Sequence, residues 1–428
     1  MTLKISPVAP LSRFLGVVAC LILLAGCGGS SSTTVTPPPV TSANNAVGVD
    51  VDLGPTGYFV NGIFTTVEVC APGSTTNCTS VPDVLVDTGS SGLRLLSSAL
   101  GSLSLPSVTD SSRNDVQECV QFISLAYIWG PVAQADIHMA GETASSAAVQ
   151  IISESPQYNV PLSCLTLGSS GAVDYNTVQA LGANGILGVG NYPQDCTECT
   201  ISGICSSPCT SAANGVPQYY ICPSGDCQIA SVPATGILSN PVALFSQDNN
   251  GVLISLPTVP ATGQATASGS LIFGIGTQSN NALGSAQIYA TDAYADFTTT
   301  YNGTRYSDSF IDSGSNALYF LDAATLGNID CADAAGFYCP AETLNFTVTN
   351  TGANGTTGQV TFSTANADAL FKTGFAAFND LGGDSGTGPS SDYFDFGIPF
   401  FYGRNVFVGI AGKTVPNGAS APYGYWAY

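Results

Sequence analysis

The sequence predicts a mostly β protein built from two similar lobes. Glycine (48 residues) and proline (25 residues) are frequent, and from about residue 47 onward short runs of β-branched and aromatic residues alternate with turn signals. Helical periodicity is confined to a few short stretches. One sequence pattern also occurs twice, 225 residues apart, which indicates two lobes of related structure.

The balance of charges excludes several classes of function. The chain has 428 residues, with 29 Asp and Glu, 8 Lys and Arg, one His and a net charge of −21. Eight basic residues cannot neutralise a nucleic acid backbone, so nucleic acid is not an expected partner. The single His138 leaves no histidine cluster for zinc, and we expect neither a metal nor another cofactor. Carboxylates are therefore the main candidates for acid–base chemistry.

The N-terminus has the features of an export signal. Lys4 and Arg13 precede an apolar run, Phe14–Ala25, that is too short to span a bilayer and suits a signal peptide over residues 1–26. The run ends in Leu-Ala-Gly-Cys27, which resembles the lipobox of bacterial lipoproteins. This resemblance implies cleavage before Cys27 and a lipid on its thiol, although an ordinary cleaved signal is the alternative.

The residues after Cys27 set the expected location. Gly28 stands where such lipoproteins often carry an aspartate for retention at the inner membrane, so the outer membrane is expected, on its periplasmic or surface face. Residues 27–48 lack apolar periodicity and are expected to form a flexible tether. The protein would then contact the membrane through its N-terminal lipid anchor.

Cysteine usage indicates an oxidising compartment. Without Cys20 and Cys27 twelve of the 14 cysteines remain, an even number that favours disulfides in an exported chain. The expected pairs outside the crowded stretch are Cys70 with Cys78, Cys331 with Cys339, and Cys119 with Cys164. The crowded stretch holds Cys196, Cys199, Cys205, Cys209, Cys222 and Cys227. Its C-x-x-C could bind zinc in a cytosolic protein, but we expect three disulfides of undetermined connectivity.

The pattern of strands divides the chain into two lobes. We place the N-terminal lobe at residues 49–285, with a cysteine-rich insertion at residues 195–230, and the C-terminal lobe at residues 286–428. The expected strands include Phe59–Cys70, Asp83–Val86, Val132–Met139, Val252–Leu256, Ser270–Ile275 and Val406–Ile410. The expected short helices are Thr177–Leu181 and Asn366–Thr373.

The internal repeat points to two aspartates. Residues 84–95 read VLVDTGSSGLRL and residues 309–320 read SFIDSGSNALYF, so that Asp87 and Asp312 each follow an apolar strand and precede a glycine. These segments resemble the paired active-site loops of pepsin-like aspartic proteases. Further matches follow in that family's order over residues 184–190, 241–276 and 394–409, so the resemblance covers most of the chain.

The resemblance implies a fold and a set of roles. It implies two β lobes with a central cleft, and a bacterial lipoprotein branch of uncharacterised function matches more closely than pepsin itself. Asp87 and Asp312 would be catalytic. The residues that would support them are Thr88, Gly89, Ser90, Ser313, Gly314 and Ser315. The threonine and serine that directly follow the aspartates would each hydrogen-bond to the opposite loop.

The chemistry of such a pair can be argued from the carboxyls alone. Two carboxyls about 3 Å apart cannot both ionise, so they hold one proton between them and titrate as a unit. One member is then a base for a water molecule, and the other is an acid for the scissile carbonyl. Asp87 and Asp312 therefore suit hydrolysis of an amide.

The sequence departs from the family pattern at the flap, the hairpin that closes over substrate. Residues 118–142 correspond to it but lack the glycines of the family's tip, and Tyr127 and Trp129 are the candidates for its aromatic residue. Arg94 stands where pepsin-like enzymes usually have a tryptophan that supports the flap. In the second lobe Asp395 replaces an apolar residue of the family's pattern.

We therefore expect an aspartic-type endopeptidase that acts on extended peptides or proteins. The alternative is an inactive protein of the same fold, a surface lipoprotein that serves as a binding or adhesion module. The altered flap motivates this alternative. In either case we expect a monomer.

Overall fold

The computed structural model describes residues 43–428 apart from 168–169, 197–217, 233, 328 and 386–392. The predicted signal peptide, the lipidation site Cys27 and most of the predicted tether lie outside the described residues, as do Cys199, Cys205 and Cys209. No helix within the described part of the chain is long and apolar enough to cross a membrane.

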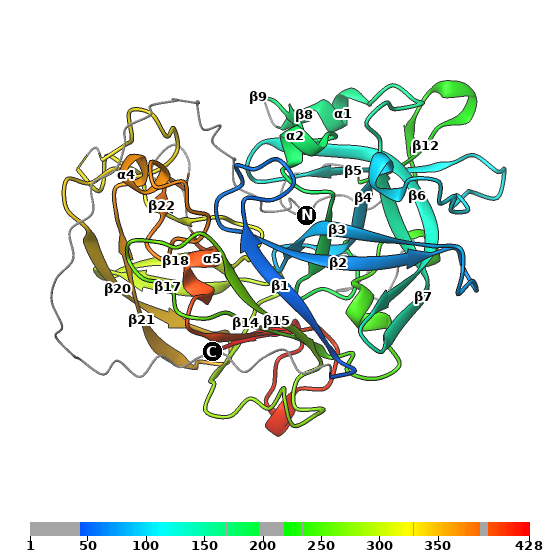
Figure 1. The fold of residues 1–428 in the computed structure, drawn as a ribbon. Coiled ribbons are helices and arrows are strands. Elements are labelled where there is room, and N and C mark those ends of the chain that lie inside the picture. The colour runs from blue at the N-terminus through cyan, green and yellow to red at the C-terminus, as the bar shows by residue number, and fades with distance from the viewer. Residues whose placement is uncertain (1–42, 168–169, 197–217, 233, 328, 386–392) are drawn as a thin grey trace, which may run out of the picture.

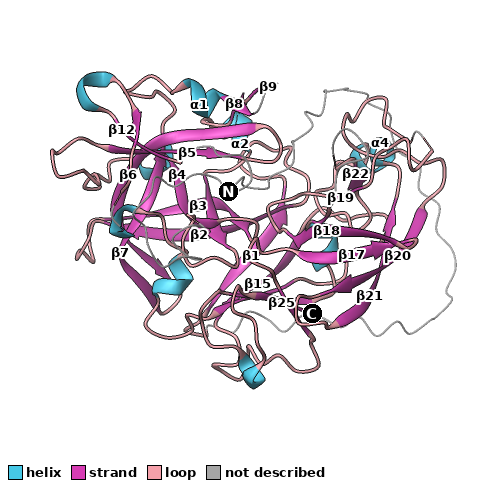
Figure 2. Cartoon of the chain, turned by 180° about the vertical axis from the view of Figure 1, so that it is seen from behind, coloured by secondary structure: helices cyan, strands magenta, loops and turns pink. Residues whose placement is uncertain are grey.

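Strands dominate the molecule and form two large sheets. Figure 1 shows the N-terminal lobe, coloured blue to green, on one side and the yellow-to-orange part of the C-terminal lobe on the other, with β1, β14 and β15 between them. Figure 2 shows the same arrangement from behind. The predicted mostly β, two-lobed fold is confirmed. A central cleft between the lobes stays a prediction.

The larger sheet has 16 strands. In chain order they are β1 Ala46–Asp52, β2 Gly62–Cys70, β3 Cys78–Asp87, β4 Ser91–Leu96, β5 Val116–Gln121, β6 Ala126–Met139, β7 Glu142–Ile152, β10 Val173–Asp174, β11 Gly185–Val189, β12 Tyr219–Ile221, β13 Gln228–Ile229, β14 Gly251–Ser255, β15 Ala267–Phe273, β16 Ile288–Ala290, β24 Asn405–Gly409 and β25 Tyr425–Ala427.

The second large sheet has seven strands and lies in the C-terminal lobe. They are β17 Phe297–Tyr301, β18 Thr304–Ile311, β19 Leu318–Phe320, β20 Leu344–Thr351, β21 Thr357–Thr364, β22 Gly382–Gly383 and β23 Phe394–Phe396. A separate short pair consists of β8 Thr166–Leu167 and β9 Ser170–Gly171.

Helical segments are short, as the sequence predicts. The α-helices are α1 Leu162–Leu165, α2 Val178–Leu181, α4 Ala367–Phe371 and α5 Ile398–Phe401. The 3-10 helices are η1 Ser97–Leu100, η2 Pro223–Gly225, η3 Ala234–Gly236, η4 Pro241–Leu244 and η5 Pro416–Gly418. Thr177 and Asn366 cap α2 and α4 by accepting backbone N–H groups, which explains why both helices begin where the sequence predicts.

Part of the larger sheet closes on itself. The strands β2, β3, β11, β4, β7 and β6 are paired in a ring, because β6 also pairs with β2. Alternation along β2 shows why: Val67 and Val69 are buried inside the ring, and Glu68 between them faces solvent. This barrel-like ring holds the first aspartate, Asp87, at the end of β3.

The larger sheet also runs across the predicted boundary between the lobes. β14 of the N-terminal lobe pairs with β24 of the C-terminal lobe, with Gly251 opposite Gly409. The boundary between residues 285 and 286 therefore stays a prediction. At the other end of the chain the structure shortens the predicted tether, because Ala46 already pairs with Ile272 as the first residue of β1.

Disulfides cross-link segments within both lobes. All three predicted pairs are present, and a fourth lies at the end of the cysteine-rich insertion. The described pairs are Cys70–Cys78, Cys119–Cys164, Cys222–Cys227 and Cys331–Cys339. Cys196 is also disulfide-bonded.

Candidate active site

The two predicted aspartates occupy equivalent places in the two lobes. Asp87 is the last residue of β3, beside which β11 runs parallel, and Asp312 follows the last residue of β18, beside which β23 runs parallel. Buried apolar residues on all four strands belong to one hydrophobic core shared by the lobes. The repeated sequence therefore folds into the same local structure twice.

Hydrogen bonds lock the two aspartate loops together. The Thr88 hydroxyl donates to the carbonyl of Ile311 (3.1 Å) and accepts the backbone N–H of Ser313 (2.9 Å). In the reverse direction the Ser313 hydroxyl donates to the carbonyl of Val86 (2.7 Å) and accepts the backbone N–H of Thr88 (3.1 Å). Each loop thus satisfies two buried backbone groups of the other, which is the role predicted for Thr88 and Ser313.

The loops bring the two carboxyls into contact. The backbone N–H of Gly89 donates both to Asp87 Oδ1 (2.8 Å) and to Asp312 Oδ1 (3.1 Å). Gly314 donates to Asp312 Oδ1 in the same way (2.8 Å). One N–H group thus serves both carboxyls, and two buried carboxyls this close cannot both ionise, so the pair holds a proton.

Close approach explains the two glycines. A Cβ atom at Gly89 would lie 2.7 Å from the carboxyl carbon of Asp312, and one at Gly314 would lie 2.7 Å from Asp87 Oδ1. Real Cβ atoms do not come so close to other heavy atoms, so each glycine makes room for the aspartate of the opposite loop.

Serine hydroxyls hold the outer carboxyl oxygens. Ser90 donates to Asp87 Oδ2, and Ser315 lies 3.1 Å from Asp312 Oδ2. Both interactions agree with the predicted supporting roles. Ser315 has a second acceptor, Asp395 Oδ2, at 2.6 Å. Sequence reasoning identified Asp395 as a departure from the family pattern but assigned it no role.

Burial sets the proton affinity of the pair. Both aspartates are fully buried, and burial raises the pKa of each. For Asp87 this effect is opposed by hydrogen bonds from Asp312, Ser90 and Gly89. For Asp312 the charges of Asp87 and Asp395 add to burial and hold the pKa well above its usual range. The pair as a whole therefore retains one proton more readily than a free carboxyl does.

The predicted flap is a hairpin of β5 and β6 whose aromatic candidates pack inward. Tyr127 donates to Asp174 (3.1 Å), and burial with this contact raises the pKa of its phenol to about 12. Trp129 is fully buried and packs edge-on against Tyr220, with ring centroids 5.3 Å apart. Both belong to a cluster around the Cys119–Cys164 disulfide. These contacts are those of packing residues, and a role in a flap stays a prediction.

Arg94, where the sequence departs from the family pattern, forms a buried ion cluster. Its guanidinium is fully buried and forms ion pairs with Glu118 (2.7 Å) and Asp195 (2.9 Å). Tyr219 donates to Asp195 at 2.8 Å. Arg94 also donates to the carbonyl of Ser91, the first residue of its own strand β4. Its ion pair with Glu118 therefore links β4, the strand after the first aspartate loop, to β5 of the hairpin. The sequence offered no signal for these partners, which lie far along the chain.

One group of possible metal ligands occurs among the described residues. It consists of Cys331, Cys339 and Asp368. The two cysteines form a disulfide, so their sulfurs are not thiolates and do not suit a metal ion.

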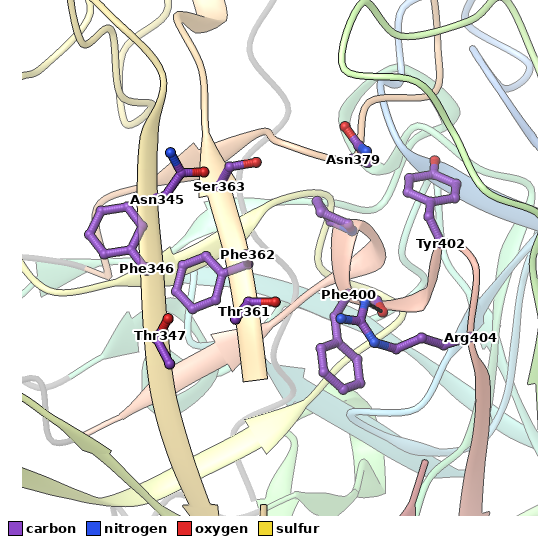
Figure 3. A pocket seen from close by; sticks show the side chains of 11 residues that line it. Asn345, Phe346, Thr347, Thr361, Phe362, Ser363, Asn379, Phe400, Tyr402 and Arg404 are labelled. Carbon is purple, nitrogen blue, oxygen red and sulfur yellow. Dashed lines mark hydrogen bonds between the residues drawn. The ribbon is translucent and has the colours of Figure 1, made fainter. Parts of the chain in front are cut away.

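The C-terminal lobe contains a cavity of about 470 Å³ between the hairpin β20–β21 and the segment that includes α5. Figure 3 shows the Arg404 guanidinium over the ring of Phe400, 4.6 Å from its centroid, and across the cavity from Phe362. Arg404 also donates to the carbonyl of Phe400 (2.6 Å). None of the predicted site residues lines this cavity.

The fold and the site define a class: a two-lobed β protein in which each lobe contributes one aspartate to a buried pair. The chain belongs to the family described as "Protein of unknown function (DUF3443)", whose model matches residues 41–428. No curated protein matches the chain. Among solved structures it is similar to an aspartic proteinase from Irpex lacteus, at 12% sequence identity, with 89% of this chain and 96% of that chain covered and a TM-score of 0.43.

Proposed function

We propose that this protein is an aspartic endopeptidase that hydrolyses peptide bonds with a water molecule activated by Asp87 and Asp312. The observation that carries the proposal is the buried pair of carboxyls that share the N–H of Gly89. A purely structural role for two adjacent buried carboxyls would be costly, because each must be kept from repelling the other.

The proposed reaction uses the pair as one acid and one base. Asp87, the ionised member, accepts a proton from a water molecule as its oxygen attacks the scissile carbonyl. Asp312 gives its proton to the carbonyl oxygen, so that a tetrahedral diol forms. The carbon–nitrogen bond then breaks as the nitrogen takes the proton from Asp87 and one hydroxyl of the diol returns its proton to Asp312. The pair therefore again holds one proton for the next cycle.

The substrate class follows from this chemistry. We expect extended peptides or unfolded proteins, with no cofactor, because the reaction needs only water and the two carboxyls. We further propose that the protein is an exported bacterial lipoprotein, held at the outer membrane by a lipid on Cys27 and acting as a monomer. Nine cysteines of the described residues, four pairs and Cys196, are disulfide-bonded, which suits such an oxidising compartment.

A binding or adhesion lipoprotein without catalysis is the second candidate. The observation that favours it is the hairpin of β5 and β6, whose aromatic residues Tyr127 and Trp129 are engaged in packing. The complete burial of Asp87 and Asp312 points the same way, because a substrate must reach both carboxyls.

Proteolysis by the full mature chain decides between the candidates. A denatured protein is incubated with the wild type and with Asp87→Asn between pH 3 and 7, and new peptide ends are identified by mass spectrometry. We expect cleavage in the acidic part of this range and a loss of at least about 100-fold in Asp87→Asn, the scale of losing a general base. Asp380→Asn is the matched control, because Asp380 is also buried but does not contact the pair. Cleavage that persists in Asp87→Asn, or none at any pH, would reject the protease.

A further inference from the structure

A third carboxyl reaches the aspartate pair through one hydroxyl group. Asp395 lies on β23 with 2% of its surface exposed. Its Oδ2 atom is 2.6 Å from the hydroxyl oxygen of Ser315, which in turn lies 3.1 Å from Asp312 Oδ2. The side chains of Asp395, Ser315 and Asp312 therefore form a continuous chain of polar atoms.

The first lobe provides an internal comparison for this position. In the first lobe Ile186 on β11 lies opposite Leu85, two residues before Asp87. In the second lobe Asp395 on β23 lies opposite Phe310, two residues before Asp312. The same register thus holds an apolar residue in one lobe and a carboxyl in the other. Burying a carboxyl where an apolar side chain fits is costly, so this asymmetry requires a compensating interaction.

The Ser315 hydroxyl supplies the interaction and restricts where protons can lie. It has one hydrogen, which it can donate to only one of its two carboxyl neighbours at a time. When it donates to Asp395, the Asp312 oxygen that faces it must carry a proton, or two lone pairs would meet. When it donates to Asp312, Asp395 must carry the proton instead.

The two arrangements interconvert without a co-reactant. In one, the O–H of Asp312 donates to Ser315 and the O–H of Ser315 donates to the Asp395 carboxylate. In the other, the O–H of Asp395 donates to Ser315 and the O–H of Ser315 donates to the Asp312 carboxylate. Passing between them moves two protons in the same direction, with one O–H bond broken and one formed at each step. The charge of the group and the hydroxyl of Ser315 are unchanged.

We propose that Asp395 is a positioning residue that acts through Ser315 to keep the acid proton of the pair on Asp312 and thereby to leave Asp87 as the base. The shorter of the two Ser315 contacts is the one to Asp395, which favours the arrangement with the proton on Asp312. The consequence for catalysis rests on the proposed protease function, whereas the effect on the pair's protonation does not.

The charges around Asp395 agree with this assignment. After burial and the charge of Asp87, the charge of Asp395 is a further cause of the raised pKa of Asp312. Asp395 also helps to raise the pKa of Tyr393, after burial. Tyr319, opposite Asp395 on β19, donates its hydroxyl to Asn316. Neither phenol supplies a positive charge to Asp395.

The test measures the protonation of the pair directly. Asp residues are labelled with ¹³C at the carboxyl, and the full mature chain is titrated by NMR as wild type, Asp395→Asn and Asp380→Asn. Removing the Asp395 charge makes it easier for the pair to lose its proton, so we expect the highest apparent pKa of the pair to fall by about one pH unit. The control Asp380→Asn should leave it unchanged. An unchanged pair in Asp395→Asn would overturn the proposal.

Variants of Ser315 test the same link independently, in case Asp395→Asn fails to fold. Ser315→Ala breaks the link and should lower the same apparent pKa, whereas Ser315→Thr keeps a hydroxyl and should restore it. A structural role alone would lower the melting temperature of both variants without this difference. Equal titration of the alanine and threonine variants would reject the positioning role.

The pH profile of peptide cleavage separates this inference from the proposed function. If the wild type cleaves, the fall of kcat/KM on the alkaline side of the pH profile should begin about one pH unit lower in Asp395→Asn. KM should be nearly unchanged. An unshifted limb would overturn the inference while leaving the protease intact. If the wild type does not cleave, the proposed function fails, and the NMR titration alone decides the role of Asp395.

Discussion

Gly89 lies where the two aspartate loops leave no room for a side chain. Its N–H serves both aspartates, and an added Cβ would lie 2.7 Å from the Asp312 carboxyl. The neighbour cannot yield, because the carboxyl is fixed by Ser315 and by the N–H of Gly314. The space for the pair is therefore defined by backbone atoms.

We predict that Gly89→Ala separates the two carboxyls. Cleavage should fall by at least about 100-fold, because displacements of the order of 1 Å cost this much. Overpacking should lower the free energy of unfolding by about 1–3 kcal/mol. Cleavage assays and urea unfolding measure the two effects. Gly48→Ala is the control, since nothing lies within 4 Å of the Cβ position there. An active Gly89→Ala would show that the loops can move apart without loss.

Residues near the aspartates differ in how far the sequence could predict them. The resemblance to pepsin-like proteases implied the cross-loop contacts of Thr88 and Ser313, because each sits in a local motif that recurs in both lobes. The contact between Ser315 and Asp395 was not, because it joins residues 80 positions apart. No local pattern states which carboxyl a distant hydroxyl will meet, and only the strand register places them together.

At the scale of elements, the hairpin of β5 and β6 is attached to the first aspartate loop by a buried ion cluster. Arg94 on β4 pairs with Glu118 on β5 and with Asp195. Two carboxyls share one guanidinium, and burial together with the nearby Asp195 holds the pKa of Glu118 well above its usual range. The sequence marked Arg94 as unusual, but its partners are 24 and 101 positions away.

We predict that Arg94→Met destabilises the protein by about 3–5 kcal/mol near pH 7, because it leaves two buried carboxyls without their cation. The loss should be smaller near pH 4, where protonation of Glu118 removes its unpaired charge. Urea unfolding at both pH values measures the difference. Arg305→Met is the matched control, since Arg305 is exposed on β18 and should cost less than about 0.5 kcal/mol. An equal loss at both pH values would mean that lost packing, not charge, dominates.

At the scale of the whole molecule, the two lobes share one sheet and one core. The larger sheet passes from β1, β15 and β14 into β24 and β25, and the main hydrophobic cluster contains residues of both lobes. The sequence repeat predicted two lobes, but it could not predict this shared sheet, because pairing between β14 and β24 joins segments about 150 positions apart. The shared sheet fixes the two aspartate loops relative to each other.

Excess negative charge is the other property of the whole molecule. The net charge is −21, and the ion pairs among the described residues are those of the buried Arg94. Several buried carboxyls also bind protons more tightly in the folded state than in the unfolded chain. Burial raises the pKa of Asp380 to about 6, and it raises the pKa values of Asp87, Asp312 and Glu118.

We predict that the protein is more stable near pH 5 than near pH 8. A carboxyl whose folded pKa is raised stabilises the fold below its unfolded pKa, and this contribution is lost as the pH rises through the folded value. For Asp380 the loss falls between about pH 4 and pH 6. Thermal unfolding of the full mature chain should therefore show a melting temperature that falls by several degrees from pH 5 to pH 8. The expected scale is on the order of 2–4 °C per kcal/mol.

Salt separates the two sources of this pH dependence. Repulsion among exposed carboxylates is screened within about 3 Å in 1 M salt, whereas buried carboxyls are hardly affected. We expect the fall in melting temperature to shrink in 1 M NaCl but to persist, and to become smaller again in Asp380→Asn, which removes one buried acid. A melting temperature that rises from pH 5 to pH 8 would contradict the prediction. A fall that salt abolishes would mean that surface charge alone, and not the buried carboxyls, causes it.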